Sequence, residues 1–191
     1  MMALPWFGKY SGESTEQLLA LEGKFRTDSL VVAFEQAIQS KVFRDGGDVS
    51  VPERVVLAIE SLEQEVNNGG YDQFFRNSSI QYAPTLVDAL ARAGCPKAAA
   101  VAERAIRSLG LDVVSVESIQ AAMEVGSEER DMALNPCDQE FYEYQEDLAG
   151  KVLDYIRYNR DAYSDSLTGD SISFINRSDQ SRELASSRSN L

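Results

Sequence analysis

The chain has 191 residues, of which 31 are acidic and 18 basic, and this gives a formal net charge of −13. A chain of this length fits one domain, and its excess of negative charge disfavours direct binding to nucleic acid or to an anionic membrane surface. The sequence contains no histidine, which excludes histidine-dependent catalytic triads and histidine-bearing zinc sites.

The two cysteines, Cys95 and Cys137, are too few for a disulfide framework and form no C-x-x-C pair. We therefore expect ordinary buried thiols in a cytoplasmic, reducing environment. Residues 1–10 lack the basic region and sustained apolar run of a signal peptide. No stretch approaches the roughly 20 apolar residues of a membrane span, so no membrane partner is expected.

The N-terminal part of the chain predicts an extended arm followed by helices. Residues 1–12 combine glycines and a proline with aromatic rings, and we expect an arm that docks one of those rings onto the domain. A short helix is predicted within 11–21. A clearer helix is capped by Asp28 and ends before the turn-forming residues 45–48, whose two acids and two glycines do not match the spacing of a calcium loop.

A long helix is predicted to begin at Ser50 and Pro52, a cap residue and a favoured first-turn residue. Its apolar stripe recurs at i, i+4, i+7 and i+11 and comprises Val55, Ile59, Leu62 and Val66. Gly69 and Gly70 tolerate positive φ, so we expect this helix to end there and a short aromatic helix to follow. We interpret this corner as architecture, with a ligand site in the corner as the alternative.

The polar side of the same helix carries Glu60, Glu63 and Asn67. Residues of these types can hold a metal ion or act as paired carboxylates in acid–base catalysis. The sequence offers no histidine and no second carboxylate-rich helix of matching pattern, so we interpret all three as solvated flank positions.

Further helices are predicted from Pro84 and over Lys97–Leu109, which is rich in alanine. The strand-like run Val113–Val116 has no partner and is interpreted as the lead-in to a helix. We therefore predict an all-α fold: a single compact domain of about seven or eight short to medium helices over residues 13–163. Residues 164–191 are predicted to form a mobile tail.

The residues around the glycine corner read E-V-N-N-G-G-Y-D-Q-F-F-R-N, and this sequence resembles the motif of a bacterial family of unknown function typified by a DMP-type DNA-mimic protein. The matching positions are Glu65, Asn67, Asn68, Gly69, Gly70, Tyr71, Gln73, Phe74, Phe75 and Asn77. The resemblance covers about residues 30–163 and departs from the family at Ile80, where glycine is common. It implies a mostly helical fold and an acidic surface that occupies the DNA-binding surface of another protein.

The segment Asp112–Leu148 holds eleven acids against the single base Arg130. We expect its end to form the start of one long closing helix with a core stripe of Phe141, Tyr144, Leu148, Val152 and Tyr155. On that helix Glu140, Glu143 and Asp147 would be stepped by about 4.5 and 6 Å, like a ladder of phosphates. The candidate partner-binding acids are Glu117, Glu124, Glu128, Glu129, Asp131, Glu140, Glu143 and Asp147.

Two functions are in competition. The first is an acidic protein-binding domain that mimics DNA on a basic DNA-binding protein or transcription factor. The second is a non-mimic interaction module, immunity-like or for assembly, that uses the corner or the alanine-rich helix, with an acidic face that only confers solubility.

No enzyme activity, cofactor or metal is predicted, because the sequence shows no nucleophile with its base, phosphate-binding loop or metal-ligand spacing. A homodimer would extend the acidic surface.

Overall fold

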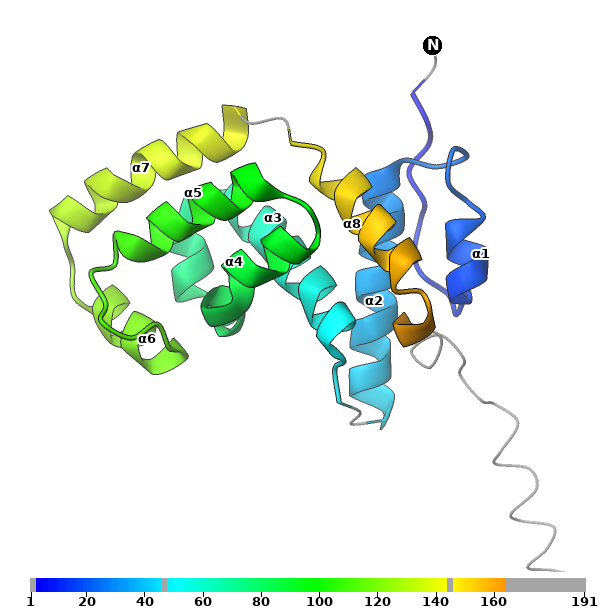
Figure 1. Cartoon of the computed structure of the whole chain (residues 1–191), viewed down its shortest axis with the longest axis horizontal. Coiled ribbons are helices and arrows are strands. Elements are labelled where there is room, and N and C mark those ends of the chain that lie inside the picture. The colour runs from blue at the N-terminus through cyan, green and yellow to red at the C-terminus, as the bar shows by residue number, and fades with distance from the viewer. Residues whose placement is uncertain (1–2, 46–47, 144–145, 164–191) are drawn as a thin grey trace, which may run out of the picture.

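The computed structural model describes residues 3–45, 48–143 and 146–163. These residues form eight α-helices and one short 3-10 helix and contain no β-strand, which confirms the all-α prediction (Figure 1). No helix within these ranges has both the length and the apolarity needed to cross a membrane. The predicted mobile tail, 164–191, lies outside the described residues.

The elements in chain order are α1 (Thr15–Leu19), α2 (Thr27–Asp45), α3 (Val51–Arg76), the 3-10 helix η1 (Ser78–Tyr82), α4 (Ala83–Arg92), α5 (Pro96–Arg107), α6 (Val116–Glu124), α7 (Glu128–Glu143) and α8 (Leu148–Tyr158). Several start where the sequence predicts a cap or proline. Ser50 caps α3 in a reciprocal capping box with Glu53. Asp28, in contrast, lies in the first turn of α2 and is not its cap, because the helix already begins at Thr27.

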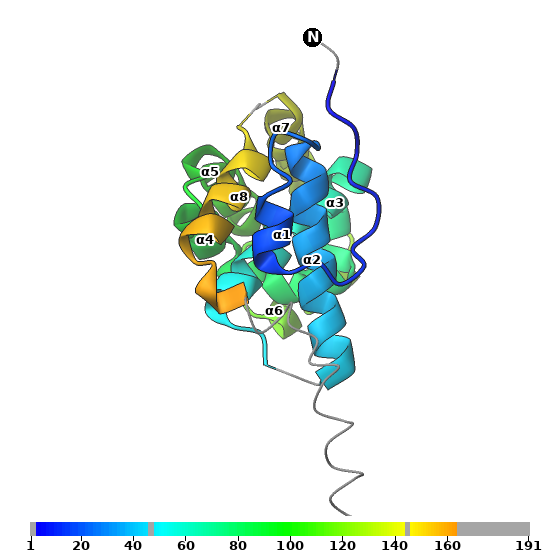
Figure 2. The same cartoon turned by 90° about the vertical axis from the view of Figure 1, so that its right-hand side faces the viewer.

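Helix α3 is the centre of the fold and contacts α2, α4, η1, α6, α7 and α8. In Figures 1 and 2, α1, α2 and α8 gather at one end of the molecule, and α4 to α7 lie toward the other. Tyr71, Phe74 and Phe75 on α3 are fully buried. Burying rings of this size stabilises a fold by roughly 1.5–3 kcal/mol each. The central helix therefore joins the two ends through one continuous core.

Both ends of the described chain are fastened to this core. Phe7 in the N-terminal arm packs edge to face on Phe25, with 5.3 Å between ring centroids, and its N–H donates to Ser29 Oγ at 2.9 Å. Tyr163, after α8, is fully buried and donates its hydroxyl proton to the carbonyl oxygen of Pro52 at 2.8 Å. These contacts hold the arm on α2 and the chain after α8 on the start of α3.

The prediction of one long closing helix is wrong. Helix α7 ends at Glu143 and a separate helix, α8, begins at Leu148. The Asp147 side chain accepts a hydrogen bond from the N–H of Gly150 at 2.9 Å and so forms the N-cap of α8. The apolar spacing of 3.6 residues continues across the break, and that is why periodicity alone predicts a single helix. Tyr144 lies outside the described residues.

Candidate functional site

The acidic segment forms two consecutive helices, α6 and α7, which lie toward the same end of the molecule (Figure 1). Ser115 caps α6 by accepting from the N–H of Ser118 at 3.1 Å, while Ser118 Oγ accepts from the N–H of Ser115 at 3.0 Å. Ile119 and Met123 bury the inner side of α6. The strand-like lead-in to this helix therefore has the role predicted for it.

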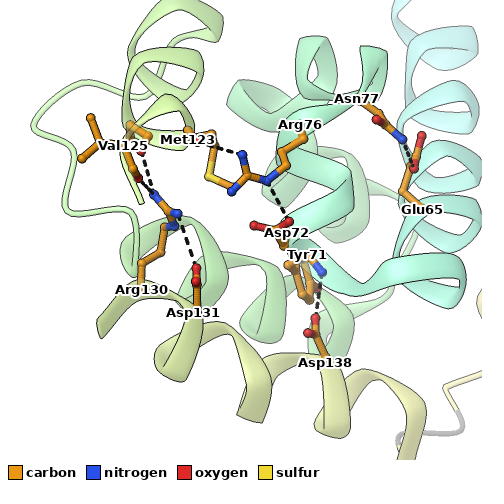
Figure 3. Close-up of polar contacts among 11 residues, drawn as sticks. Glu65, Tyr71, Asp72, Arg76, Asn77, Met123, Val125, Arg130, Asp131 and Asp138 are labelled. Atoms are coloured by element: carbon orange, nitrogen blue, oxygen red, sulfur yellow. Dashed lines mark hydrogen bonds and ion pairs between the residues drawn. The ribbon is translucent and has the colours of Figure 1, made fainter. Parts of the chain in front are cut away.

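Arg130, the only base in this segment, faces inward. Its side chain is buried, and its guanidinium donates to the carbonyl oxygens of Ala122 at 2.7 Å and Val125 at 2.9 Å (Figure 3). These groups belong to the end of α6, where helix carbonyls lack intrahelical partners and the dipole is negative. A longer contact of 3.4 Å reaches Asp131. Arg130 thus stabilises the α6–α7 junction. Because its charge is directed to these carbonyl groups, it does not pair with most of the acids in the segment.

Five of the predicted acids lie on these two helices. All five are exposed, on α6 or in the first turn of α7, and they are Glu117, Glu124, Glu128, Glu129 and Asp131. The pKa of Glu117 is lowered by hydrogen bonds from its own backbone N–H and from the Ser115 hydroxyl. Acids in the first turn of a helix also stabilise it through their attraction to the positive end of the helix dipole. We call these five residues the acidic end.

The predicted ladder of Glu140, Glu143 and Asp147 does not exist as one row on one helix. Glu140 forms an ion pair with Arg104 of α5, Glu143 is the exposed last residue of α7, and Asp147 caps α8. Between Asp131 and Glu140, nine residues and about 14 Å along the axis, the exposed positions of α7 are uncharged: Met132, Ala133, Asn135, Pro136 and Gln139. The acids therefore form separate groups and no continuous phosphate-like row.

The glycine corner is a kink within α3. Gly69 has φ −162° and Gly70 has φ +73°, and the helix resumes beyond them. The carboxylate of Glu65 accepts from Asn77 Nδ2 at 2.8 Å (Figure 3). It also accepts from Gln73 Nε2 at 2.6 Å and so ties the two arms of the kink together. These contacts give the polar motif residues a structural purpose.

A residue of α7 completes the kink. Asp138 accepts a hydrogen bond at 2.7 Å from the N–H of Tyr71, which the kink removes from the helical ladder (Figure 3). A Cβ on Gly70 would lie 2.7 Å from Asp138 Cγ, so only glycine fits both the positive φ and this close approach. Unlike Glu65, Gln73 and Asn77, the exposed residues Asn67 and Asn68 make no side-chain hydrogen bond to another described residue.

The interpretation of Glu60 as a solvated flank residue is wrong. Glu60 is only 8% exposed, and burial followed by the charge of Glu63 raises its pKa well above the ordinary value. Burial raises the pKa of Glu63 to about 6. Both carboxylates line a surface cavity of about 330 Å³ between α2 and α3, whose lining is Asp28, Val32, Glu35, Glu60, Glu63, Gln64, Asn67 and Asn68.

The spacing of polar residues on α2 and α3 is a sequence signal for this cavity. Asp28, Val32 and Glu35 on α2 are spaced i, i+4 and i+7, as one face of a helix requires. Glu60, Glu63 and Asn67 have the spacing i, i+3 and i+7 on α3. Two acid-bearing stripes of equal length on consecutive helices indicate a shared polar groove. A second cavity, of about 210 Å³, adjoins the first through Glu63 and Asn67.

Fold and site together define an all-helical acidic protein built on a kinked central helix. A family model described as DMP19-like protein matches residues 47–159, which is more than half of the chain. The chain therefore belongs to the DMP19-like protein family, which confirms the family resemblance. No curated protein and no solved structure matches it.

Proposed function

We propose that this protein is a DNA mimic whose acidic end occupies the DNA-binding surface of a basic DNA-binding protein, such as a transcription factor. One observation carries the proposal: Glu117, Glu124, Glu128, Glu129 and Asp131 are all exposed on α6 or in the first turn of α7, while the only arginine of their segment is turned inward to cap α6. Membership of the DMP19-like family is consistent with this function.

The charge of the acidic end favours a basic partner. A surface with a large excess of negative charge steers a positively charged partner toward it and repels acidic ones. Arg76 of α3 reaches the end of α6, where it donates to the carbonyl oxygen of Met123 at 2.8 Å, but its charge is paired with Asp72. Because α6 and α7 are joined by a capped junction, their carboxylates are held on packed helices instead of a loop. A fixed array loses less conformational entropy on binding than flexible acidic side chains on a loop would.

An interaction module that binds at the corner is the competing function, and the exposed, unbonded amides of Asn67 and Asn68 favour it. The alanine-rich helix α5 is a weaker surface for such a partner. Its inward residues Ala98, Ala102 and Ala105 are buried in the core of the protein itself. A corner partner would be insensitive to the removal of charge from α6 and α7.

The test is affinity capture from a bacterial lysate, with elution in salt steps and with duplex DNA as competitor. The triple variant Glu124→Gln, Glu128→Gln, Glu129→Gln removes three charges from the acidic end. A matched control, Glu16→Gln, Asp48→Asn, Asp161→Asn, removes three exposed charges elsewhere on the chain. We expect a basic DNA-binding protein to be retained by the wild type and the control, displaced by DNA, and lost with the triple variant. A partner that ignores DNA and all three charges would contradict mimicry.

A further inference from the structure

The cavity between α2 and α3 has a negative lining, and no basic side chain is among its lining residues. Its eight lining residues include four carboxylates and neither lysine nor arginine. Two of the four are engaged: Asp28 pairs with Arg26, and Glu35 accepts from Gln39 Nε2 at 2.9 Å. The charges that act on Glu60 are those of Glu63, Glu35 and Asp28, and all of them oppose its ionisation.

Glu60 is the decisive residue. It is more than nine-tenths buried, lines the cavity, and makes no hydrogen bond or ion pair within the described residues. A buried carboxyl group without a partner is costly, and proteins normally pair such groups. Glu63, beside it, is also without a hydrogen bond to any described residue. The cavity opens to solvent past the exposed side chains of Gln64, Asn67 and Asn68.

We propose that this cavity binds an organic cation, an alkylammonium or guanidinium group, whose charge is held by Glu60 and Glu63 and whose remaining N–H groups donate to the side-chain oxygens of Asn67 and Asn68. An alkylguanidinium carries five N–H donors, enough for two carboxylates and two amides, and an alkylammonium carries three, enough for both carboxylates and one amide. The site is made by α2 and α3, and it is separate from the acidic end on α6 and α7. It also gives the two asparagines of the corner a purpose beyond the kink.

An organic cation fits better than a metal ion because the carboxylates are spread along the groove. Among the described residues, no three acids or cysteines converge closely enough to hold a metal. A cavity of about 330 Å³ has room for the end of a lysine or arginine side chain with several waters. The bound cation would also lower the pKa of Glu60 and Glu63, since an opposite charge favours the ionised carboxylate.

The test is an NMR titration at pH 7.5 of protein with ¹³C-labelled glutamate carboxyl groups. The probes are butylammonium and ethylguanidinium chloride, with sodium chloride at equal ionic strength as reference. We expect saturable shifts of the Glu60 and Glu63 signals. Affinity should fall about tenfold or more in Glu60→Gln, which removes one charged acceptor. This isosteric change removes a buried charge, so the variant is expected to fold.

Two further arms identify the source of the cation and separate this site from the proposed function. Spermidine represents a free amine, and blocked Gly-Lys-Gly and Gly-Arg-Gly peptides represent a partner's side chain; binding of either class supports the site and names its source. The triple variant of the acidic end should bind the probes as the wild type does. Shifts that do not saturate, or that persist unchanged in Glu60→Gln, would overturn the proposal.

Discussion

At the scale of single residues, the kink in α3 depends on a few atoms placed at one point. Gly70 supplies the positive φ, Tyr71 presents the N–H that the kink frees, and Asp138 accepts it from another helix. The sequence predicts the turn, since two consecutive glycines favour one. It does not predict Asp138, which lies 67 residues from Tyr71 and appears in the sequence as one more acid of a charged segment.

The Gly70→Ala variant should be among the more damaging single changes in the chain. A side chain at φ +73° costs roughly 1–2 kcal/mol, and contact with the Asp138 carboxylate adds to that. We expect a loss of about 2 kcal/mol or more in the free energy of unfolding, measured by urea denaturation. Gly126→Ala is the control, because a Cβ there meets no atom within 4 Å. Equal stability of the two variants would show that the kink is not constrained as described.

The buried carboxylates of α3 predict how stability changes with pH. The pKa of Glu63 in the folded protein, about 6, lies above that of an unfolded glutamate, about 4.3. The folded protein therefore holds the proton of the Glu63 carboxyl group more tightly than the unfolded chain does. The resulting stabilisation of the folded state is complete at pH values below the unfolded pKa and is lost as the pH rises through about 6. Glu60 acts in the same direction.

Urea unfolding between pH 4.5 and 7.5 measures this effect. The wild type should lose stability across the window, and Glu63→Gln should flatten the loss and be more stable at pH 7 by about 1 kcal/mol, a figure reduced for partial solvent screening. Glu129→Gln, at an exposed acid of the acidic end, serves as the control and should follow the wild-type profile. A Glu63→Gln profile as steep as the wild type would refute this account.

At the scale of elements, local chemistry predicts helix starts better than helix ends. Ser50 with Pro52 marks the start of α3 correctly, and the starts predicted at Pro84 and Lys97 each lie one residue after the observed starts of α4 and α5. Apolar periodicity runs through the break between α7 and α8 and so does not reveal it, although Asp147, whose side chain accepts from the N–H of Gly150, caps α8 there. The burial of Glu60 depends on α2 lying opposite, and a polar residue on one helix does not reveal its neighbour.

Helix α6 depends on Arg130, which leads to a prediction about local stability. The Arg130→Met variant keeps much of the apolar stem but leaves the carbonyls of Ala122 and Val125 without their donor. We expect amide hydrogen exchange across α6 to be faster by about tenfold or more, which corresponds to the loss of buried hydrogen bonds at its end. Arg107→Met, at an exposed arginine paired with Glu103 four residues earlier, should leave α6 unchanged. Unaltered exchange in Arg130→Met would show that the cap is dispensable.

At the scale of the whole molecule, the fold separates two kinds of negative charge. The acids of the acidic end are exposed and face solvent, whereas Glu60 and Glu63 line a cavity between α2 and α3. Composition alone predicts an acidic protein but not this division, because it arises from which helices pack together. The same division lets one set of variants test mimicry and another test cation binding without interference.

The most direct measurement of the central claim is the affinity for the captured basic partner as a function of salt, between about 50 and 300 mM. Charges on the acidic end should make the logarithm of the binding constant fall steeply with the logarithm of salt concentration, as for phosphate contacts. The slope should become shallower in Glu124→Gln, Glu128→Gln, Glu129→Gln and stay unchanged in the control Glu16→Gln, Asp48→Asn, Asp161→Asn. A flat dependence in the wild type, or equal slopes in all three proteins, would contradict DNA mimicry by this face.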